Sequence, residues 1–179
     1  MKKEKPITTI LGYVDQKMMN ILSKDKGISF SNYRNEYHQA SNFNQLYEYP
    51  VHVDIELTNL CNYSCGFCVQ GLKPKDEFYR KKKILEKEVV FDLMEHCRKI
   101  GVKSVQFNGQ DEPTLYPDLI KVLKYASNLG FDDIFFNTNG SKLNKEYSGE
   151  LIESGLTKLQ ISIDAFSKET YFKVRKKRN

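Results

Sequence analysis

Residues 102–137 read VKSVQFNGQDEPTLYPDLIKVLKYASNLGFDDIFFN, and this stretch decides the fold. Residues 102–107, which include Val102, Val105 and Phe107, have the character of a strand and lead into a polar loop at 108–116. Pro117 then stands where the first turn of a helix tolerates proline. Apolar residues next recur at helical spacing, and a second strand-like segment, DIFFN, follows at 133–137. The stretch therefore predicts a strand, a helix and a second strand in succession.

The same alternation continues on both sides of this stretch. Strands are predicted at 51–57, 102–107, 133–137 and 159–164, and helices at 88–100, 117–129, 143–154 and from Lys168, with Ser167 as its cap. Regular alternation at this spacing is typical of right-handed strand–helix–strand units around a parallel sheet. The sequence therefore predicts an α/β fold whose sheet is covered on both faces or closed as a barrel.

The first 50 residues lack a clear period. A helix is predicted from Ile10 to Leu22, whereas residues 27–50 are rich in Asn, Tyr and Ser and are predicted to be irregular. We expect residues 1–50 to be an N-terminal extension and residues 51–179 to form the α/β domain.

The composition excludes some classes of protein. The chain has 179 residues, 40% of them hydrophobic, and 28 Lys and Arg against 23 Asp and Glu give a net charge of +5. This is a globular balance, and no apolar run approaches the roughly 18 residues of a membrane span. Because no apolar stretch follows the charged start, we expect a cytoplasmic protein. The basic runs at 1–5, 73–87 and 175–178 are interpreted as solvated surface, since no nucleic-acid motif accompanies them.

Three of the four cysteines lie within eight residues. Cys61, Cys65 and Cys68 have the spacing C-x3-C-x2-C, and Cys97 lies on the apolar stripe of the helix at 88–100, where we expect a core residue. Thiolates suit iron–sulfur clusters, zinc or copper, and a structural zinc site normally takes four protein ligands. Three cysteines leave one corner of a metal site open for a substrate or cofactor.

Polar segments follow each predicted strand. They are residues 61–68, 108–113 and 137–140, together with Ser162 and Asp164. Active sites of parallel α/β proteins lie at the carboxyl ends of the strands. We therefore expect these segments to meet on one rim of the sheet.

The cysteine spacing, with Phe67 just before the third cysteine, resembles the signature of the radical SAM superfamily. This resemblance implies a [4Fe–4S] cluster on Cys61, Cys65 and Cys68, with S-adenosylmethionine (SAM) on the fourth iron. It also implies an electron donor such as flavodoxin or ferredoxin, and reductive cleavage to a 5′-deoxyadenosyl radical that abstracts hydrogen from a substrate, which the sequence does not identify. The protein then positions the cofactor and excludes side reactions.

Three other segments also resemble the family. Residues 108–113 resemble its Gly-Gly-Glu-Pro motif, although Gln110 and Asp111 depart from that pattern, and Thr138-Asn139-Gly140 resembles its Thr-Asn-Gly turn. The strand at 159–164 resembles its Ser-Leu-Asp-Gly segment. The resemblance assigns the SAM contacts to Phe67, Gly109, Gln110, Asp111, Glu112, Pro113, Asn139, Ser162, Asp164 and Arg175. Of these, Ser162 and Arg175 are expected at the methionine carboxylate, Asp164 near the ribose and Phe67 near the adenine.

The resemblance also implies a partial (β/α) barrel of six units, of which this chain holds about four. We therefore expect a fragment of a longer enzyme, truncated before strands five and six, from the branch with a C-terminal SPASM domain. Two alternatives stay open. A catalytically incompetent α/β domain could bind a cluster or zinc through the same cysteines, and a nucleic-acid-binding module would show steeply salt-dependent binding.

Overall fold

The computed structural model describes residues 7–72, 81 and 83–176. The chain divides into two compact units, Met1–Leu46 and Tyr47–Asn179. No helix among the described residues is long and apolar enough to cross a membrane. Most of the basic residues at 1–5 and 73–87 lie outside the described residues, as do the last two of the run at 175–178.

The first unit consists of helices α1 (Ile7–Lys26) and α2 (Ile28–Ser41). The prediction of irregular structure over residues 27–50 is therefore wrong for α2. Its aromatic residues explain why: Phe30, Tyr33 and Tyr37 are spaced three and four apart, and neighbouring ring centroids lie 5.8 and 6.2 Å from each other. Such pairs support a helix in a segment whose Asn and Ser content favours turns.

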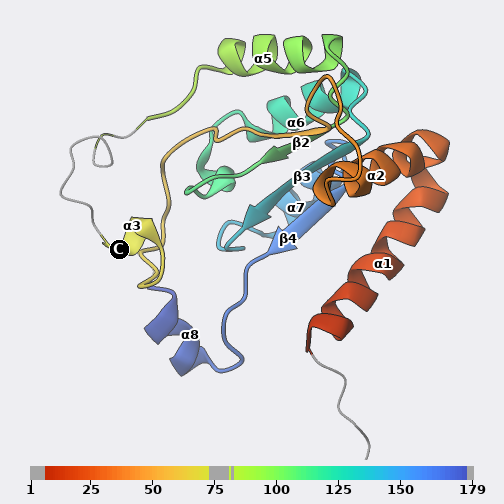
Figure 1. Ribbon diagram of the computed structural model, residues 1–179. Helices are drawn as coiled ribbons and strands as arrows, with labels where there is room; N and C mark the ends of the chain where they lie inside the picture. The colour runs from red at the N-terminus through yellow and green to blue at the C-terminus, as the bar shows by residue number, and fades with distance from the viewer. Residues whose placement is uncertain (1–6, 73–80, 82, 177–179) are drawn as a thin grey trace, which may run out of the picture. The chain divides into compact units, whose positions relative to one another are not determined.

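Four parallel strands form one sheet in the second unit, in the order β1–β2–β3–β4 (Figure 1). Their bounds are His52–Asp54, Ser104–Phe107, Asp133–Thr138 and Lys158–Ile161. The register sets Val105 opposite Ile134 and Phe107 opposite Phe136. The predicted α/β fold with a parallel sheet is confirmed.

Most helices of the second unit follow the strands as the periodicity predicts, but the short helix α3, directly after the cysteine loop, was not predicted. Their bounds are Val69–Leu72 for α3, Lys87–Lys99 for α5, Leu119–Asn128 for α6, Lys145–Ile152 for α7 and Lys168–Val174 for α8, with a 3₁₀ turn η1 at Pro113–Leu115. Ser167 caps α8 as predicted, because its side chain accepts a hydrogen bond from the Thr170 N–H at 3.2 Å.

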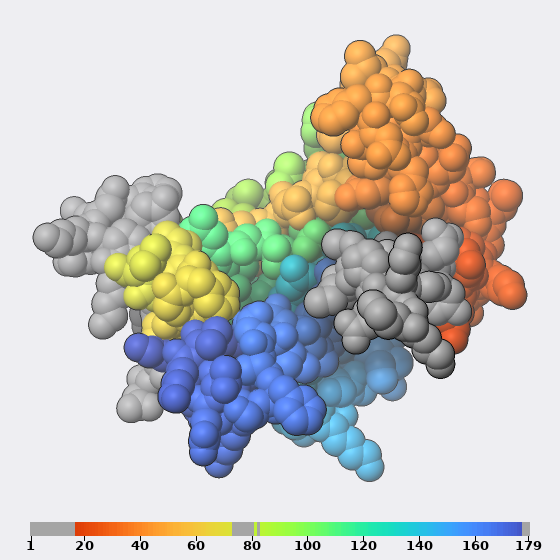
Figure 2. Space-filling model, turned by 60° about the horizontal axis from the view of Figure 1, so that its bottom comes forward, coloured from red at the N-terminus to blue at the C-terminus, as the bar shows by residue number. Residues whose placement is uncertain are grey.

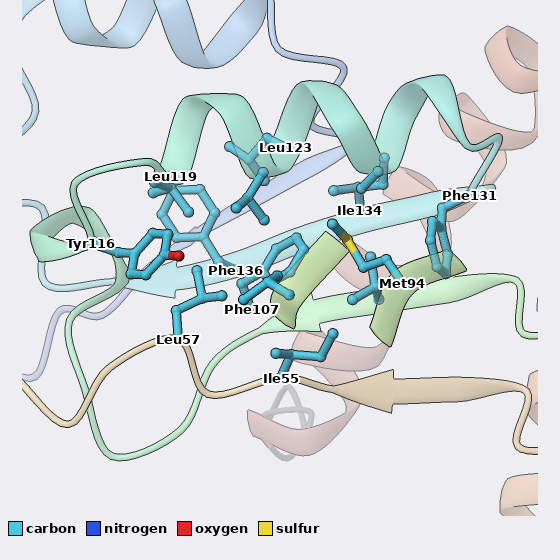
Figure 3. Packing of buried hydrophobic residues seen from close by; sticks show 14 of the residues in the cluster. Ile55, Leu57, Met94, Phe107, Tyr116, Leu119, Leu123, Phe131, Ile134 and Phe136 are labelled. Carbon is cyan, nitrogen blue, oxygen red and sulfur yellow. The ribbon is translucent and has the colours of Figure 1, made fainter. Parts of the chain in front are cut away.

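One face of the sheet packs against the helices and forms the core (Figure 3). Val105 and Phe107 of β2 and Ile134 and Phe136 of β3 are at most 1% exposed. The helices contribute Val90, Met94, Cys97, Leu119, Val122, Leu123, Ala126 and Leu151. Burying each large side chain is worth about 1.5–3 kcal/mol, so this core fixes the strand ends and the loops that leave them. Cys97, 6% exposed, is confirmed as a core residue.

Three details differ from the predictions. β1 and β4 are shorter than expected, so Ser162 and Asp164 follow the sheet instead of lying within it. The helix predicted at 143–154 is shorter in the structure, and Ile152, its last residue there, is 79% exposed whereas Leu151 is buried. Val89 of α5 is 50% exposed, so the buried side of this helix consists of fewer residues than its apolar residues would suggest.

Candidate functional site

A cavity of about 230 Å³ opens at the carboxyl end of the sheet. It is lined by Cys61, Tyr63, Cys65, Phe67, Cys68, Asn108, Gly109, Asp111, Glu112, Asn137, Thr138, Asn139, Ser162 and Arg175. These residues come from the segments after all four strands, from the last two residues of β3 and from the segment after α8. The structure thus brings together the rim segments that the alternation predicts.

The cysteine loop, residues 61–68, is a compact turn beside α3. The Cys68 N–H donates to the Cys65 carbonyl at 3.0 Å, and the Gly71 N–H donates to the Cys68 carbonyl at 2.8 Å. A Cβ on Gly71 would lie 1.9 Å from the Cys65 carbonyl oxygen, so this close approach requires glycine. The turn therefore presents Cys65 and Cys68 to one cavity.

The Cys65 side chain is buried, and those of Cys61 and Cys68 are partly buried. Burial raises the pKa of Cys61 and of Cys65, and the positive charge of Arg175 partly offsets the effect on Cys65. Over the described residues, no group of three or more His, Cys, Asp and Glu side chains is arranged as a metal site. The three cysteines thus share a cavity without being gathered around one point.

Two side chains hold the acidic loop, residues 108–113, beside the cysteine loop. Glu56 Oε1 accepts a hydrogen bond from the Gln110 N–H at 2.7 Å, and Gln70 Nε2 donates to the Gln110 carbonyl at 2.7 Å. A Cβ on Gly109 would lie 2.4 Å from Glu56 Cδ, so the glycine lets this carboxylate reach the loop backbone. The sequence pattern does not single out Glu56 or Gln70, because both act from neighbouring segments.

Glu112 connects three rim segments through hydrogen bonds of its side chain and its backbone. Its carboxylate accepts hydrogen bonds from the hydroxyls of Thr114 and Thr138, both at 2.6 Å, and from the Asn139 N–H at 2.6 Å. Its own N–H donates to the Leu60 carbonyl at 2.7 Å. The side chain is 2% exposed, and both of its oxygens already accept hydrogen bonds from the protein. The local structure of the rim therefore depends on this carboxylate.

The neighbouring Asp111 has the opposite surroundings. Both of its carboxylate oxygens, and Oδ1 of Asn137, are buried without a hydrogen-bond partner among the described residues. Burial raises the pKa of Asp111 to about 7, and the negative charges of Glu56 and Glu112 add to the effect. The nearby backbone N–H groups of Gly109 and Asp111 lower this pKa somewhat but do not reach hydrogen-bonding geometry. Buried acceptors without donors are rare, so this part of the cavity fits a ligand that brings a cation or donors.

Arg175 lies on the far side of the cavity, directly after α8. Its Nε donates to the Asp164 carboxylate, and its guanidinium carbon lies 6.0 Å from the centre of the Phe67 ring. Burial lowers the pKa of Arg175, but the hydrogen bond and charge of Asp164 outweigh burial and raise it overall. The residues expected at the carboxylate, the ribose and the adenine of SAM thus contact one another.

Most of the predicted cofactor residues line the cavity; Gln110, Pro113 and Asp164 are not among the lining residues. Ser162 continues the pairing beyond β4, since its N–H donates to the Thr138 carbonyl at 2.8 Å. Asn137 is a lining residue that the sequence analysis left unassigned. The available signal was a polar side chain near the end of an otherwise apolar strand.

A sequence model of the Radical SAM superfamily matches residues 55–179. The chain belongs to this superfamily. The probable GTP 3′,8-cyclase of Saccharolobus solfataricus is 34% identical over 120 residues, which cover 67% of this chain and 37% of that protein. The protein of the same name from Methanothermobacter marburgensis is 29% identical over 121 residues, or 68% of this chain and 37% of that one. This radical SAM chain thus spans little more than a third of the length of these curated relatives.

Solved structures show the same fold. The crystal structure of Streptococcus suis SuiB bound to S-adenosylmethionine has a TM-score of 0.60 and 22% identity, and the match covers 83% of this chain and 33% of that one. BtrN in complex with AdoMet and 2-DOIA has a TM-score of 0.57 and 19% identity, with 73% of this chain and 51% of that one covered. These likenesses support the assignment of the sheet to a radical SAM partial barrel.

Radical SAM enzymes use a [4Fe–4S] cluster and SAM, and the side chains that line the cavity have donor and acceptor chemistry suited to both. Three thiols form the donor set that an iron–sulfur cluster takes. The unpaired oxygens of Asp111 and Asn137 suit the ammonium group of a methionine moiety, which brings a positive charge and several N–H donors.

Proposed function

We propose that this chain binds a [4Fe–4S] cluster through Cys61, Cys65 and Cys68 and binds SAM in the adjoining cavity for reductive cleavage. The observation that carries the proposal is that the cysteine loop and the unpaired acceptors line the same cavity in a radical SAM chain. When bound, the cluster and SAM supply a 5′-deoxyadenosyl radical, formed with one electron from a donor such as flavodoxin or ferredoxin, and this radical abstracts hydrogen from a substrate.

The side chains around the cavity have separate tasks in this proposal. The three cysteine thiolates hold the cluster and leave one iron for the cofactor. Asp111 and Asn137 accept hydrogen bonds from the methionine ammonium, whose positive charge offsets the acidic surroundings of Asp111. Glu112 keeps the segments after β1, β2 and β3 in place while SAM binds.

Anaerobic reconstitution with iron and sulfide tests the proposal. We expect about four iron atoms per chain, an EPR signal of the reduced cluster that changes when SAM is added, and 5′-deoxyadenosine after reduction with dithionite. Cys65→Ala should abolish cluster assembly. Cys97→Ala, which also removes one cysteine but alters only the core, is the matched control and should retain the cluster.

Other outcomes distinguish the alternatives. If the EPR signal of the cluster does not change when SAM is added, the hypothesis of a catalytically incompetent domain is favoured. Tight binding of zinc alone would favour the same hypothesis. Unchanged iron content in Cys65→Ala would contradict the assignment of the cysteine loop.

A further inference from the structure

The segment that leaves α8, residues 174–176, runs along the cysteine loop (Figure 2 shows the two regions next to each other, in dark blue and yellow). The Ser64 N–H donates to the Lys176 carbonyl at 2.6 Å, and the Gly66 N–H donates to the Val174 carbonyl at 3.4 Å. These hydrogen bonds lie on either side of Cys65, so the backbone of this one cysteine is fixed from both neighbours.

Arg175 lies between the two accepting carbonyls and anchors this segment. Its backbone is extended, with φ −107° and ψ 91°, so its side chain leaves the backbone roughly at right angles to these carbonyls, and it reaches Asp164 and Phe67. The side chain is buried, and the Asp164 carboxylate compensates its charge. Phe67, whose ring centre lies 6.0 Å from the guanidinium carbon, belongs to the same turn as Cys65 and Cys68.

A second contact joins α8 to the loop. The ring of Tyr171 meets the ring of Tyr63 edge-on, with centroids 6.5 Å apart, and Tyr63 is 8% exposed. The Arg175 N–H donates to the Tyr171 carbonyl at 2.7 Å, so the helix end and the exit segment form one piece. Asp164, Tyr171 and Arg175 therefore act on the cysteine loop from outside it.

We propose that Arg175, paired with Asp164, is a positioning residue that holds the cysteine loop in the form that retains the cluster. This role differs from the one at the methionine carboxylate that the family resemblance implies for Arg175. The inference rests on the proposed function, since it assumes that the cysteines bind the cluster. It concerns how firmly this chain keeps its iron, before any SAM is present.

The experiment measures iron release from the reconstituted chain to a ferrous chelator, without SAM. We expect Arg175→Gln and Asp164→Asn each to speed iron release about fivefold or more and to broaden the EPR signal of the reduced cluster. The double variant should be no faster than either single variant, because both remove the same ion pair. Arg175→Lys, which keeps the charge, should restore part of the retention.

Matched controls separate this effect from general loss of structure. Lys173→Gln and Glu169→Gln remove exposed charges from the same helix and should release iron at the wild-type rate. Thermal unfolding of each variant without the cluster shows whether the fold survives.

The outcomes distinguish the two roles of Arg175. If Arg175 instead binds the methionine carboxylate, Arg175→Gln will weaken SAM binding, leave iron release unchanged and not be reproduced by Asp164→Asn, and this result overturns the proposal. If the wild-type chain takes up no cluster, the proposed function itself fails.

Discussion

Polar side chains inside the protein differ in their hydrogen bonding between the two ends of the sheet. At the amino end they pair with one another: His52 Nδ1 lies 2.8 Å from Ser104 Oγ, and the hydroxyl of Thr157 contacts the carboxylate of Asp133. At the carboxyl end, the part of the chain that the structure describes provides no donor for either oxygen of Asp111. Leaving a buried acceptor unpaired typically costs about 1–3 kcal/mol, so the folded chain carries a penalty at one end that it avoids at the other.

The difference separates side chains that maintain the structure from those available to a ligand. Even at the carboxyl end, Glu112 has donors on both oxygens, whereas Asp111, its neighbour in the chain, has none. The carboxyl end thus combines a structural carboxylate with one whose partner must come from outside the protein. The ammonium group of the SAM proposed to bind here would be such a partner, and its positive charge would relieve the penalty at Asp111.

The largest predicted effect comes from replacing the two carboxylates separately. Glu112→Ala leaves the hydroxyls of Thr114 and Thr138 and the partly buried Asn139 N–H without their acceptor, so we expect it to lower the free energy of unfolding by about 3–5 kcal/mol. Asp111→Ala removes an unpaired charge and should be neutral or stabilising. Urea denaturation of the chain without cofactors measures both, and equal losses would contradict the contrast between the two residues.

The second prediction concerns pH. The pKa of Asp111 is about 7 in the folded chain against 3.8 normally, so between about pH 4 and pH 7 the folded state keeps a proton that the unfolded state releases. The free energy of unfolding should therefore fall as pH rises through this window. Since one pKa unit corresponds to about 1.4 kcal/mol, Asp111→Asn should be more stable than wild type at pH 8 by at most about 4 kcal/mol. Below pH 4 the difference should disappear, and parallel pH curves for the two proteins would refute the assignment.

Periodic segments were predictable because their pattern is local. α5 and α6 follow the apolar stripes, and Cys97 was placed in the core by its position on one of them. α2 was missed, because its aromatic pairs support a helix whose composition favours turns. Asp111 could be recognised as a departure from the family motif, but its lack of donors depends on which groups the other rim segments place near it.

Contacts between residues that are distant in the sequence could not be predicted, because no local pattern records them. The contact of Arg175 with Asp164 depends on the path of the chain through α8. The hydrogen bond that the Gln110 N–H donates to Glu56 depends on the ends of β1 and β2 lying next to each other. Neither leaves a periodic pattern. Arg175 and Ser162, which the resemblance assigns to the methionine carboxylate, both line the cavity, but their contacts with other residues are known only from the structure.

A third prediction compares two ligands, only one of which carries the amino-acid part of SAM. S-adenosylhomocysteine carries the ammonium that Asp111 is proposed to accept, whereas 5′-methylthioadenosine lacks the amino-acid part. Asp111→Asn should weaken binding of S-adenosylhomocysteine roughly tenfold, which corresponds to about 1.4 kcal/mol for a charge-assisted hydrogen bond. Binding of 5′-methylthioadenosine should not change. Calorimetric titration of the reconstituted chain measures both, and equal weakening of the two ligands would place Asp111 away from the ammonium.

The smallest predicted effect comes from the amino end. Ser104 is fully buried, and its hydroxyl is the hydrogen-bond partner of His52 Nδ1, so Ser104→Ala should cost about 1 kcal/mol of stability. Because Ser104 begins β2 and the cavity lies at the other end of that strand, iron retention and S-adenosylhomocysteine affinity should stay at wild-type values. A loss of ligand affinity in this variant would mean that the two ends of the sheet are coupled. The contrast between an amino end whose polar side chains pair with one another and a carboxyl end whose side chains are available to a ligand would then be wrong.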